Sequence, residues 1–192
     1  MTIVYLARHG ESDWNAANRF QGHSDRPLTE LGRKQAHALA DLVAAEDVEV
    51  IYSSPLIRAL ETARIVAAPA GLEVTTRDDL REVDTGSWSG LSRAEVRERF
   101  PDGFERWISG GAGWEDGETH EEMAERVLAA LRDIAAMHPE GRVLVVSHGG
   151  PIRAIQAAAV GMGIHEYRRL RPVEPNARLS AVAVENGTIR PK

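Results

Sequence analysis

The chain contains no cysteine, which excludes disulfide bonds, thiol catalysis and thiolate metal sites. Because a chain without cysteine fits any redox compartment, this absence does not locate the protein. Long apolar runs are also missing, and residues 1–8 have neither the basic region nor the apolar length of a signal peptide. We therefore expect a cytoplasmic protein with no membrane partner.

Basic residues are in the minority. The chain has 23 Lys and Arg against 29 Asp and Glu, a formal net charge of −6. Phosphate-backbone binding needs a basic face, so no nucleic-acid partner is expected and any anionic ligand must be held by local cations. With 192 residues, 43% hydrophobic and 27% charged, the chain is typical of a globular protein with one domain. The oligomeric state stays open, with a homodimer among the options.

Metal-binding and nucleotide-binding patterns are absent as well. The 7 histidines show no His-Glu-x-x-His spacing, although two or three of them could still meet in the fold. No P-loop or dinucleotide fingerprint is found, since the glycines of residues 110–113 follow no strand-like run. We expect no metal and no cofactor.

Two histidines follow apolar runs that are typical of buried strands. Residues 3–7 lead into Arg8 and His9, and residues 143–146 lead into Ser147 and His148. Ligands of open α/β sheets bind outside the carboxyl ends of the strands, so both histidines are predicted to face one crevice.

Helical and strand patterns alternate along the chain and predict a mainly parallel sheet with helices on both faces, a three-layer α/β/α sandwich. The first helix is expected from Thr29 to about Glu46, with an apolar face formed by Leu28, Leu31, Leu39, Leu42 and Val43. A strand is predicted at 49–52, followed by a helix with Ser54 as N-cap and Pro55 in its first position. A second long helix is predicted at 119–137, where Thr119 and Glu122 can form a capping box. The last elements are a strand at 142–146, a helix starting at Pro151 and a hairpin at 178–190.

Residues 87–118 break this alternation, because three of the four tryptophans lie there among six glycines. The segment can be a helical cap packed on the core or a mobile lid. In either case it can wall the site with an aromatic surface.

The run Arg8-His9-Gly10-Glu11-Ser12 with Asn15 resembles the signature of the histidine phosphatase superfamily, also called the phosphoglycerate-mutase-like family. Further similar blocks follow in chain order, namely Gln21-Gly22, residues 27–32, residues 53–59, residues 80–84 with Gly86, Trp88 and Gly90, and residues 147–150. The resemblance runs from residue 3 to about residue 155. It implies the phosphoglycerate-mutase-like α/β/α fold, as a single domain over 1–192 with a cap or lid-like insertion at about 87–118.

The resemblance further implies a metal-independent phosphomonoesterase that hydrolyses small phosphorylated metabolites through a phosphohistidine. His9 is the candidate nucleophile, because an imidazole with one free nitrogen attacks phosphorus when its other nitrogen donates to a carbonyl. Arg8 and Arg58 supply planar cations for the phosphoryl oxygens, and His148 stabilises the group in transfer.

Glu82 matches the family position of the proton donor to the leaving oxygen, with Asp84 as the alternative acid. The resemblance places Asn15, Gln21, Gly22 and Gly149 in contact with phosphate or substrate, with loop capping as the other interpretation of the side chains. The cluster of Arg168, Arg169 and Arg171 is expected on a solvated helix face, with an extra anion subsite as the alternative.

Two other functions compete with hydrolysis. Phosphoglycerate mutases of the family carry Glu-Arg-His-Tyr-Gly where this chain has Glu82-Val83-Asp84-Thr85-Gly86, so mutase activity is the less favoured alternative. A non-catalytic phosphate-binding module is the other, disfavoured by the complete set of catalytic residue types.

Overall fold

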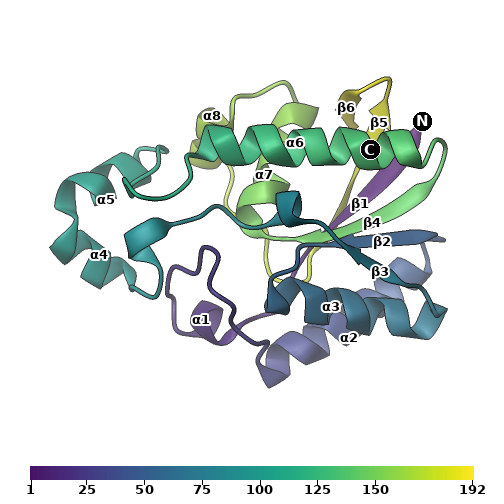
Figure 1. The fold of residues 1–192 in the computed structure, drawn as a ribbon, viewed down its shortest axis with the longest axis horizontal. Coiled ribbons are helices and arrows are strands. Elements are labelled where there is room, and N and C mark those ends of the chain that lie inside the picture. The colour runs from purple at the N-terminus through teal and green to yellow at the C-terminus, as the bar shows by residue number, and fades with distance from the viewer.

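A six-stranded sheet forms the centre of the computed structural model, which describes residues 1–192 (Figure 1). The strand order is β3-β2-β4-β1-β5-β6, and the first four of these pair in parallel while β5 and β6 form an antiparallel hairpin. The strands are β1 (Thr2–Arg8), β2 (Val50–Ser53), β3 (Val74–Thr76), β4 (Arg142–Ser147), β5 (Leu179–Glu185) and β6 (Thr188–Pro191). The predicted mainly parallel sheet is confirmed.

Helices cover both faces of this sheet, so the predicted α/β/α sandwich is also confirmed (Figure 1). One face carries α2 (Glu30–Ala44) and α3 (Ile57–Ala67), and the other carries α6 (His120–Met137), α7 (Gly149–Ala159) and α8 (Ile164–Leu170). The short helices are α1 (Asp13–Ala16), α4 (Arg93–Arg99) and α5 (Pro101–Ile108), with 3-10 turns at Ala68–Ala70, Asp78–Leu80 and Gly86–Trp88. None of the helices combines the length and apolar character that a membrane span requires.

The strand alternation of β1 divides the core into two layers. Val4 and Leu6 pack with residues of α6 and α7, whereas Tyr5 and Ala7 pack with residues of α2 and α3. Successive side chains of a strand point to opposite faces, and both faces of this central strand are buried.

The register of β1 and β4 determines where the two sequence-predicted histidines lie. Arg8 pairs with Ser147 at the carboxyl ends of these parallel strands. The His9 backbone N–H donates to the Ser147 carbonyl at 3.0 Å, so the pairing continues to the point where His9 and His148 leave the sheet. Both histidines therefore start from one edge, as predicted.

The predicted face of α2 is wrong in two positions. Leu31 and Leu42 are 51% and 55% exposed. The buried face consists of Gly32, Ala36, Leu39, Ala40 and Val43. A Cβ on Gly32 would lie 2.1 Å from the Glu11 carbonyl oxygen, so the helix approaches the loop after His9 too closely for large side chains.

The predicted start of α3 is also wrong. The helix begins at Ile57 with Leu56 as N-cap, and the Ser54 hydroxyl, which lies 2.7 Å from His148 Nε2, accepts from the Leu56 N–H at 3.3 Å, before the first helical residue. Asp25 caps the helix instead by accepting from the Ile57 N–H at 2.8 Å. The last of these differences concerns α7, which begins at Gly149, two residues before the expected Pro151.

The longest helix and the final hairpin are confirmed. Thr119 accepts from the Glu122 N–H at 3.1 Å while the Glu122 side chain accepts from the Thr119 N–H at 2.8 Å, which is the predicted capping box. Asn186 and Gly187 both adopt positive φ in the turn between β5 and β6.

Residues 87–118 form α4 and α5, which lie at the end of the molecule away from both termini (Figure 1). Trp88 is fully buried in this segment and packs edge-on against Phe20 and Trp114, with ring centroids 5.2 and 5.5 Å away. Gly103 and Gly113 leave space for its ring, since a Cβ on Gly113 would lie 2.0 Å from it. The segment is thus packed on the core around Trp88, and movement as a lid stays a prediction.

Candidate active site

A cavity of about 250 Å³ contains eight of the nine sequence-predicted site residues. The eight are Arg8, His9, Asn15, Gln21, Gly22, Arg58, Glu82 and Gly149. The ninth, His148, is fully buried next to the cavity, and its ring centroid lies 5.1 Å from that of His9. The fold therefore brings together residues from five segments of the chain.

His9 is held in one tautomer by its own loop. Its Nδ1–H donates to the Gly10 carbonyl at 2.7 Å, because a carbonyl oxygen only accepts. Nε2 therefore keeps its lone pair. Burial, and then the charges of Arg58 and Arg8, lower the pKa of His9 well below its usual value, so the imidazole is neutral and nucleophilic at physiological pH.

Arg58 is the most buried cation of the site, with 1% of its surface exposed. Its Nη1 and Nη2 groups donate to the carbonyls of Ser24 and Gly22 at 2.8 and 2.9 Å. Burial lowers the pKa of Arg58 to about 10, which the charge of Glu82 partly opposes, so the guanidinium stays charged at neutral pH. Its Nε–H has no hydrogen-bond partner within the protein.

Arg8 has the same arrangement. Its Nη1 group donates to the Glu174 carbonyl at 2.6 Å, and its buried Nε–H is also unpartnered. Burial lowers the pKa of Arg8, an effect that the charges of Glu82 and Glu174 oppose. Neither Arg8 nor Arg58 forms an ion pair with a carboxylate.

His148 adds a third buried donor. Its Nε2 lies 2.7 Å from the Ser54 hydroxyl, which already accepts from the Leu56 N–H. Because Nε2 is the only acceptor that the hydroxyl hydrogen of Ser54 can reach, we assign Ser54 as the donor to Nε2, which leaves the imidazole hydrogen on Nδ1. Burial, and then the charge of Arg58, lower the pKa of His148 well below its usual value.

Three buried donors without a protein partner thus surround His9, namely Arg8 Nε, Arg58 Nε and His148 Nδ1. Buried polar groups are normally hydrogen-bonded, and orphaned donors of this kind are rare. A phosphoryl group with several acceptor oxygens satisfies all three and neutralises the two guanidinium charges. The chemistry of the donor set therefore fits a phosphate.

The structure distinguishes the two candidate acids by position. Glu82 lines the cavity, and its Oε1 accepts from the N–H groups of Val83 and Gly150, both at 3.0 Å. Asp84 is outside the residues that line the cavity, and its Oδ1 accepts from the Gly86 N–H at 3.0 Å. Of the two candidate acids, only Glu82 lines the cavity that contains His9.

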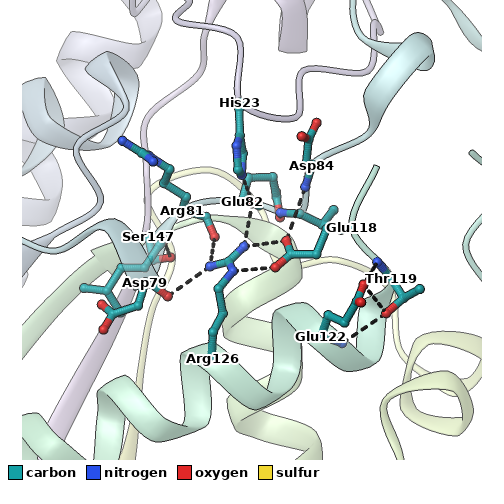
Figure 2. A network of polar contacts seen from close by, with 12 residues as sticks. His23, Asp79, Arg81, Glu82, Asp84, Glu118, Thr119, Glu122, Arg126 and Ser147 are labelled. Carbon is teal, nitrogen blue, oxygen red and sulfur yellow. Dashed lines mark hydrogen bonds and ion pairs between the residues drawn. The ribbon is translucent and has the colours of Figure 1, made fainter. Parts of the chain in front are cut away.

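Arg126 of α6 was not identified from the sequence, although it fixes the backbone around Glu82 (Figure 2). Its Nη1 donates to the carbonyls of Asp79 and Arg81, and its Nη2 to the carbonyl of Glu82, each at 2.9 Å. Glu118 neutralises Arg126 through Oε1 and Oε2 at 2.6 and 2.7 Å. The only feature of the sequence that could have indicated this role is the position of Arg126 next to Val127, one of the buried residues of α6.

The remaining polar residues combine structural and site positions. Gln21 Oε1 accepts from the Ser12 hydroxyl at 2.7 Å, and Asn15 Oδ1 accepts from the Ser12 N–H at 3.2 Å. Loop capping therefore uses both side-chain oxygens, while both residues line the cavity. Gly22 has a φ of 48°, and a Cβ there would lie 2.6 Å from Thr85 Oγ1, so a glycine is required.

The predicted cluster of three arginines is divided by the structure. Arg169 and Arg171 are exposed, in agreement with a solvated face, whereas Arg168 is half-buried and lines the cavity. No group of three or more His, Asp and Glu side chains is placed to hold a metal ion.

Comparisons with known proteins agree with this geometry. A model of the histidine phosphatase superfamily (branch 1) matches residues 4–192. Phosphoserine phosphatase 1 of Hydrogenobacter thermophilus is 38% identical over 169 residues, 87% of this chain and 80% of that protein. A probable phosphoglycerate mutase of Yersinia pestis is 38% identical over 177 residues, 89% of this chain and 80% of that protein. The solved structure of YhfR from Bacillus stearothermophilus superposes with a TM-score of 0.92 and 32% identity, covering 99% of this chain and 95% of YhfR.

Proposed function

The chain belongs to the histidine phosphatase superfamily and is a phosphomonoesterase of the histidine phosphatase type, and we propose that it acts through a phosphohistidine on His9. The observation that carries this proposal is the hydrogen bond from His9 Nδ1 to the Gly10 carbonyl at 2.7 Å. It leaves Nε2 as a free nucleophile between two unpaired guanidinium groups. The attack on phosphorus then needs no metal and no separate base.

In the first step, His9 Nε2 attacks phosphorus as the bond to the leaving oxygen breaks. Arg8, Arg58 and His148 donate to the equatorial oxygens, where charge is spread in the transition state. Glu82 donates its proton to the leaving oxygen, which departs as a neutral alcohol. The product of this step is a phosphohistidine next to the Glu82 carboxylate.

In the second step, the Glu82 carboxylate removes a proton from a water molecule, whose oxygen attacks the phosphohistidine. The N–P bond breaks, inorganic phosphate is released and His9 regains its lone pair. Glu82 ends protonated and is ready to donate again, so the cycle is balanced in protons.

Small phosphorylated metabolites are the substrate class we propose. The cavity of about 250 Å³ is smaller than the roughly 300–1,000 Å³ typical of sites for drug-sized ligands. The names of the two sequence relatives, a phosphoserine phosphatase and a probable phosphoglycerate mutase, support phosphorylated three-carbon compounds. A cytoplasmic location is part of the same proposal, since charged metabolites do not cross bilayers unaided.

The phosphohistidine is tested by rapid denaturing quench with labelled substrate. We expect an acid-labile, base-stable adduct that maps to His9 and is absent from His9→Ala. Wild-type turnover in His9→Ala, or a label on another residue, would refute the proposed nucleophile.

Mutase activity is the second candidate, because one relative is named as a probable phosphoglycerate mutase. Residues 83–85 differ from the mutase block, so we expect water to compete successfully for the phosphohistidine. The assay supplies 3-phosphoglycerate with and without 2,3-bisphosphoglycerate and measures both 2-phosphoglycerate and free phosphate. Primer-dependent isomerisation much faster than phosphate release from any substrate would establish a mutase instead.

A further inference from the structure

Four more arginines line the same cavity beyond Arg8 and Arg58. Arg19 is paired with Glu95 and Arg93 is exposed, which leaves Arg153 and Arg168 as partly buried cations without a carboxylate partner. Arg153 lies on α7, one turn after Gly149 and Gly150, and Arg168 lies on the neighbouring α8. Residues three to four apart share a helix face, so α7 presents Arg153 on the face that holds Glu82. The proposed mechanism uses neither arginine.

Neither Arg153 nor Arg168 forms an ion pair with a carboxylate. Arg153 donates through Nη2 to the carbonyls of Arg168 and Arg171, and its buried Nε–H is unpartnered. Arg168 donates through Nη1 to the carbonyls of Gly110 and Gly111. Carbonyls orient a guanidinium but do not neutralise it, and partly buried charges normally have a counter-charge.

His120 extends this group. It is 3% exposed, lines the cavity and accepts from Arg168 Nη1 through Nδ1 at 2.9 Å. Burial, and then the charges of Arg168 and His165, lower its pKa to about 3, so it is neutral. A neutral imidazole that accepts through Nδ1 carries its hydrogen on Nε2, which provides a further donor beside the two arginines.

Glu82 lines the same cavity as both groups of cations. Burial lowers the pKa of all four arginines, and the charge of Glu82 opposes that lowering at each of them, so this carboxylate lies within reach of both groups. The leaving oxygen of a substrate lies next to Glu82 under the proposed function. The atoms beyond that oxygen occupy the rest of the cavity, which Arg153 and Arg168 line.

We propose that Arg153 and Arg168 form a second anion subsite that binds a negatively charged group on the leaving part of the substrate. This inference rests on the proposed function for the placement of the phosphoryl group. The substrate class it names is a phosphomonoester with a second anion, a carboxylate or a second phosphate, a few atoms from the ester oxygen. Neutral phosphosugars and phosphoalcohols lack the group that this subsite binds.

The subsite is tested by calorimetric binding to His9→Ala, which does not depend on turnover. The matched ligands are 3-phosphoglycerate and glycerol 3-phosphate, which differ by a carboxylate in place of a hydroxymethyl group. Propane-1,3-diyl bisphosphate and propyl phosphate form the corresponding pair for a second phosphate. In at least one pair, we expect the ligand with a second anionic group to bind about tenfold or more tightly than the ligand without it. The pair that shows this difference tells whether the second anion is a carboxylate or a phosphate.

Arg153→Gln and Arg168→Gln should each reduce that ratio toward one in the His9→Ala background. Arg169→Gln is the matched control, because Arg169 is an exposed residue of the same helix α8 with the same charge. Equal affinities within both pairs, or a ratio that survives both substitutions, would overturn the subsite. Absence of hydrolysis by the wild type would refute the proposed function instead, and the binding ratios would still decide the subsite.

Discussion

His9 and His148 face each other with ring centroids 5.1 Å apart and ring planes inclined by 60°. Each residue directly follows one member of the Arg8 and Ser147 pair that ends the β1–β4 register. A shift of one residue in this register would turn the side chains of one strand to the opposite face. The approach of the two imidazoles is therefore fixed by the register of the sheet.

Glu82→Gln should reveal the role of the acid through the leaving group. An alkoxide needs a proton, whereas p-nitrophenolate leaves without one. We expect kcat/KM to fall about 100-fold or more on an alkyl phosphate and much less on p-nitrophenyl phosphate, when the first step limits both rates. Asp84→Asn is the control, and a larger effect there than at Glu82 would assign the acid to Asp84.

Arg126→Met should disturb the position of Glu82. The substitution removes three hydrogen bonds to the backbone of residues 79–82, and small displacements of a catalytic group cost about tenfold to 100-fold in rate. We expect the loss to be larger on alkyl than on aryl phosphates. Arg132→Met is the control, since Arg132 is exposed on the same helix.

A purely structural role of Arg126 predicts equal losses on both substrates. The combination with Glu82→Gln provides a second measurement, because a residue that acts through Glu82 adds little once Glu82 cannot donate a proton. Additive effects in the double variant would show that Arg126 does not act through Glu82.

Gly150→Ala should impair catalysis without unfolding the protein. A Cβ at this position would lie 2.4 Å from Glu82 Oε1 and would displace the carboxylate. We expect about a tenfold fall in kcat, with an unchanged far-ultraviolet circular dichroism spectrum. Gly163→Ala is the matched control, because a Cβ there meets nothing within 4 Å. Equal activity of the two variants would show that the Glu82 position is not decisive.

Stability should fall as the pH is lowered from about 7 to about 5. His9, His120 and His148 are buried, and burial lowers the pKa of each. A histidine whose pKa is lowered in the folded state stays neutral there, whereas the same histidine in the unfolded chain binds a proton once the pH falls below its unfolded pKa. The free energy of unfolding is therefore unaffected by this histidine above the unfolded pKa and decreases below it. Each such histidine contributes a slope of about 1.4 kcal/mol per pH unit.

Urea unfolding at a series of pH values measures this slope. His120→Gln should reduce the slope even if it also lowers stability, because the folded-state pKa of about 3 keeps His120 neutral over this pH range. His37→Gln, at an exposed position of α2, is the control. Stability independent of pH in the wild type would contradict the assignment of neutral buried histidines.

Chelation should leave hydrolysis intact, because Arg8 and Arg58 provide the counter-charge for the phosphoryl oxygens. Vanadate should inhibit, since its five-coordinate form resembles the transition state. Exhaustive chelation followed by addition of single divalent metals measures the first expectation. Activity that is lost and then restored by one metal would contradict metal independence.

The sequence was informative where local patterns decide the structure. The capping box of α6 and the hairpin of β5 and β6 depend on neighbouring residues, and both were predicted correctly. The placement of His9 and His148 at one edge also followed from local patterns, because both end an apolar strand of a parallel sheet.

The errors arose where distant segments decide. Hydropathy favoured Leu31 and Leu42 on the buried face of α2, but the close approach of this helix to Glu11 places Gly32 on that face and leaves both leucines exposed. Ser54 accepts from the Leu56 N–H, yet the helix begins only at Ile57, whose N–H donates to Asp25 of a distant loop. Arg126 and Arg153 could not be assigned for the same reason, since their partners are fixed only by the tertiary fold.

The strand order also bears on how the chain folds. The central strand β1 is the first to be synthesised, but its two neighbours are β4 and β5, whose residues begin at Arg142 and Leu179. Pairing across such separations slows folding, and on the ribosome β1 must wait for nearly the whole chain. Since His9 and His148 meet only through the pairing of β1 with β4, the chain has no catalytic centre until these two distant strands have paired, and enzymatic activity reports that this long-range pairing has formed.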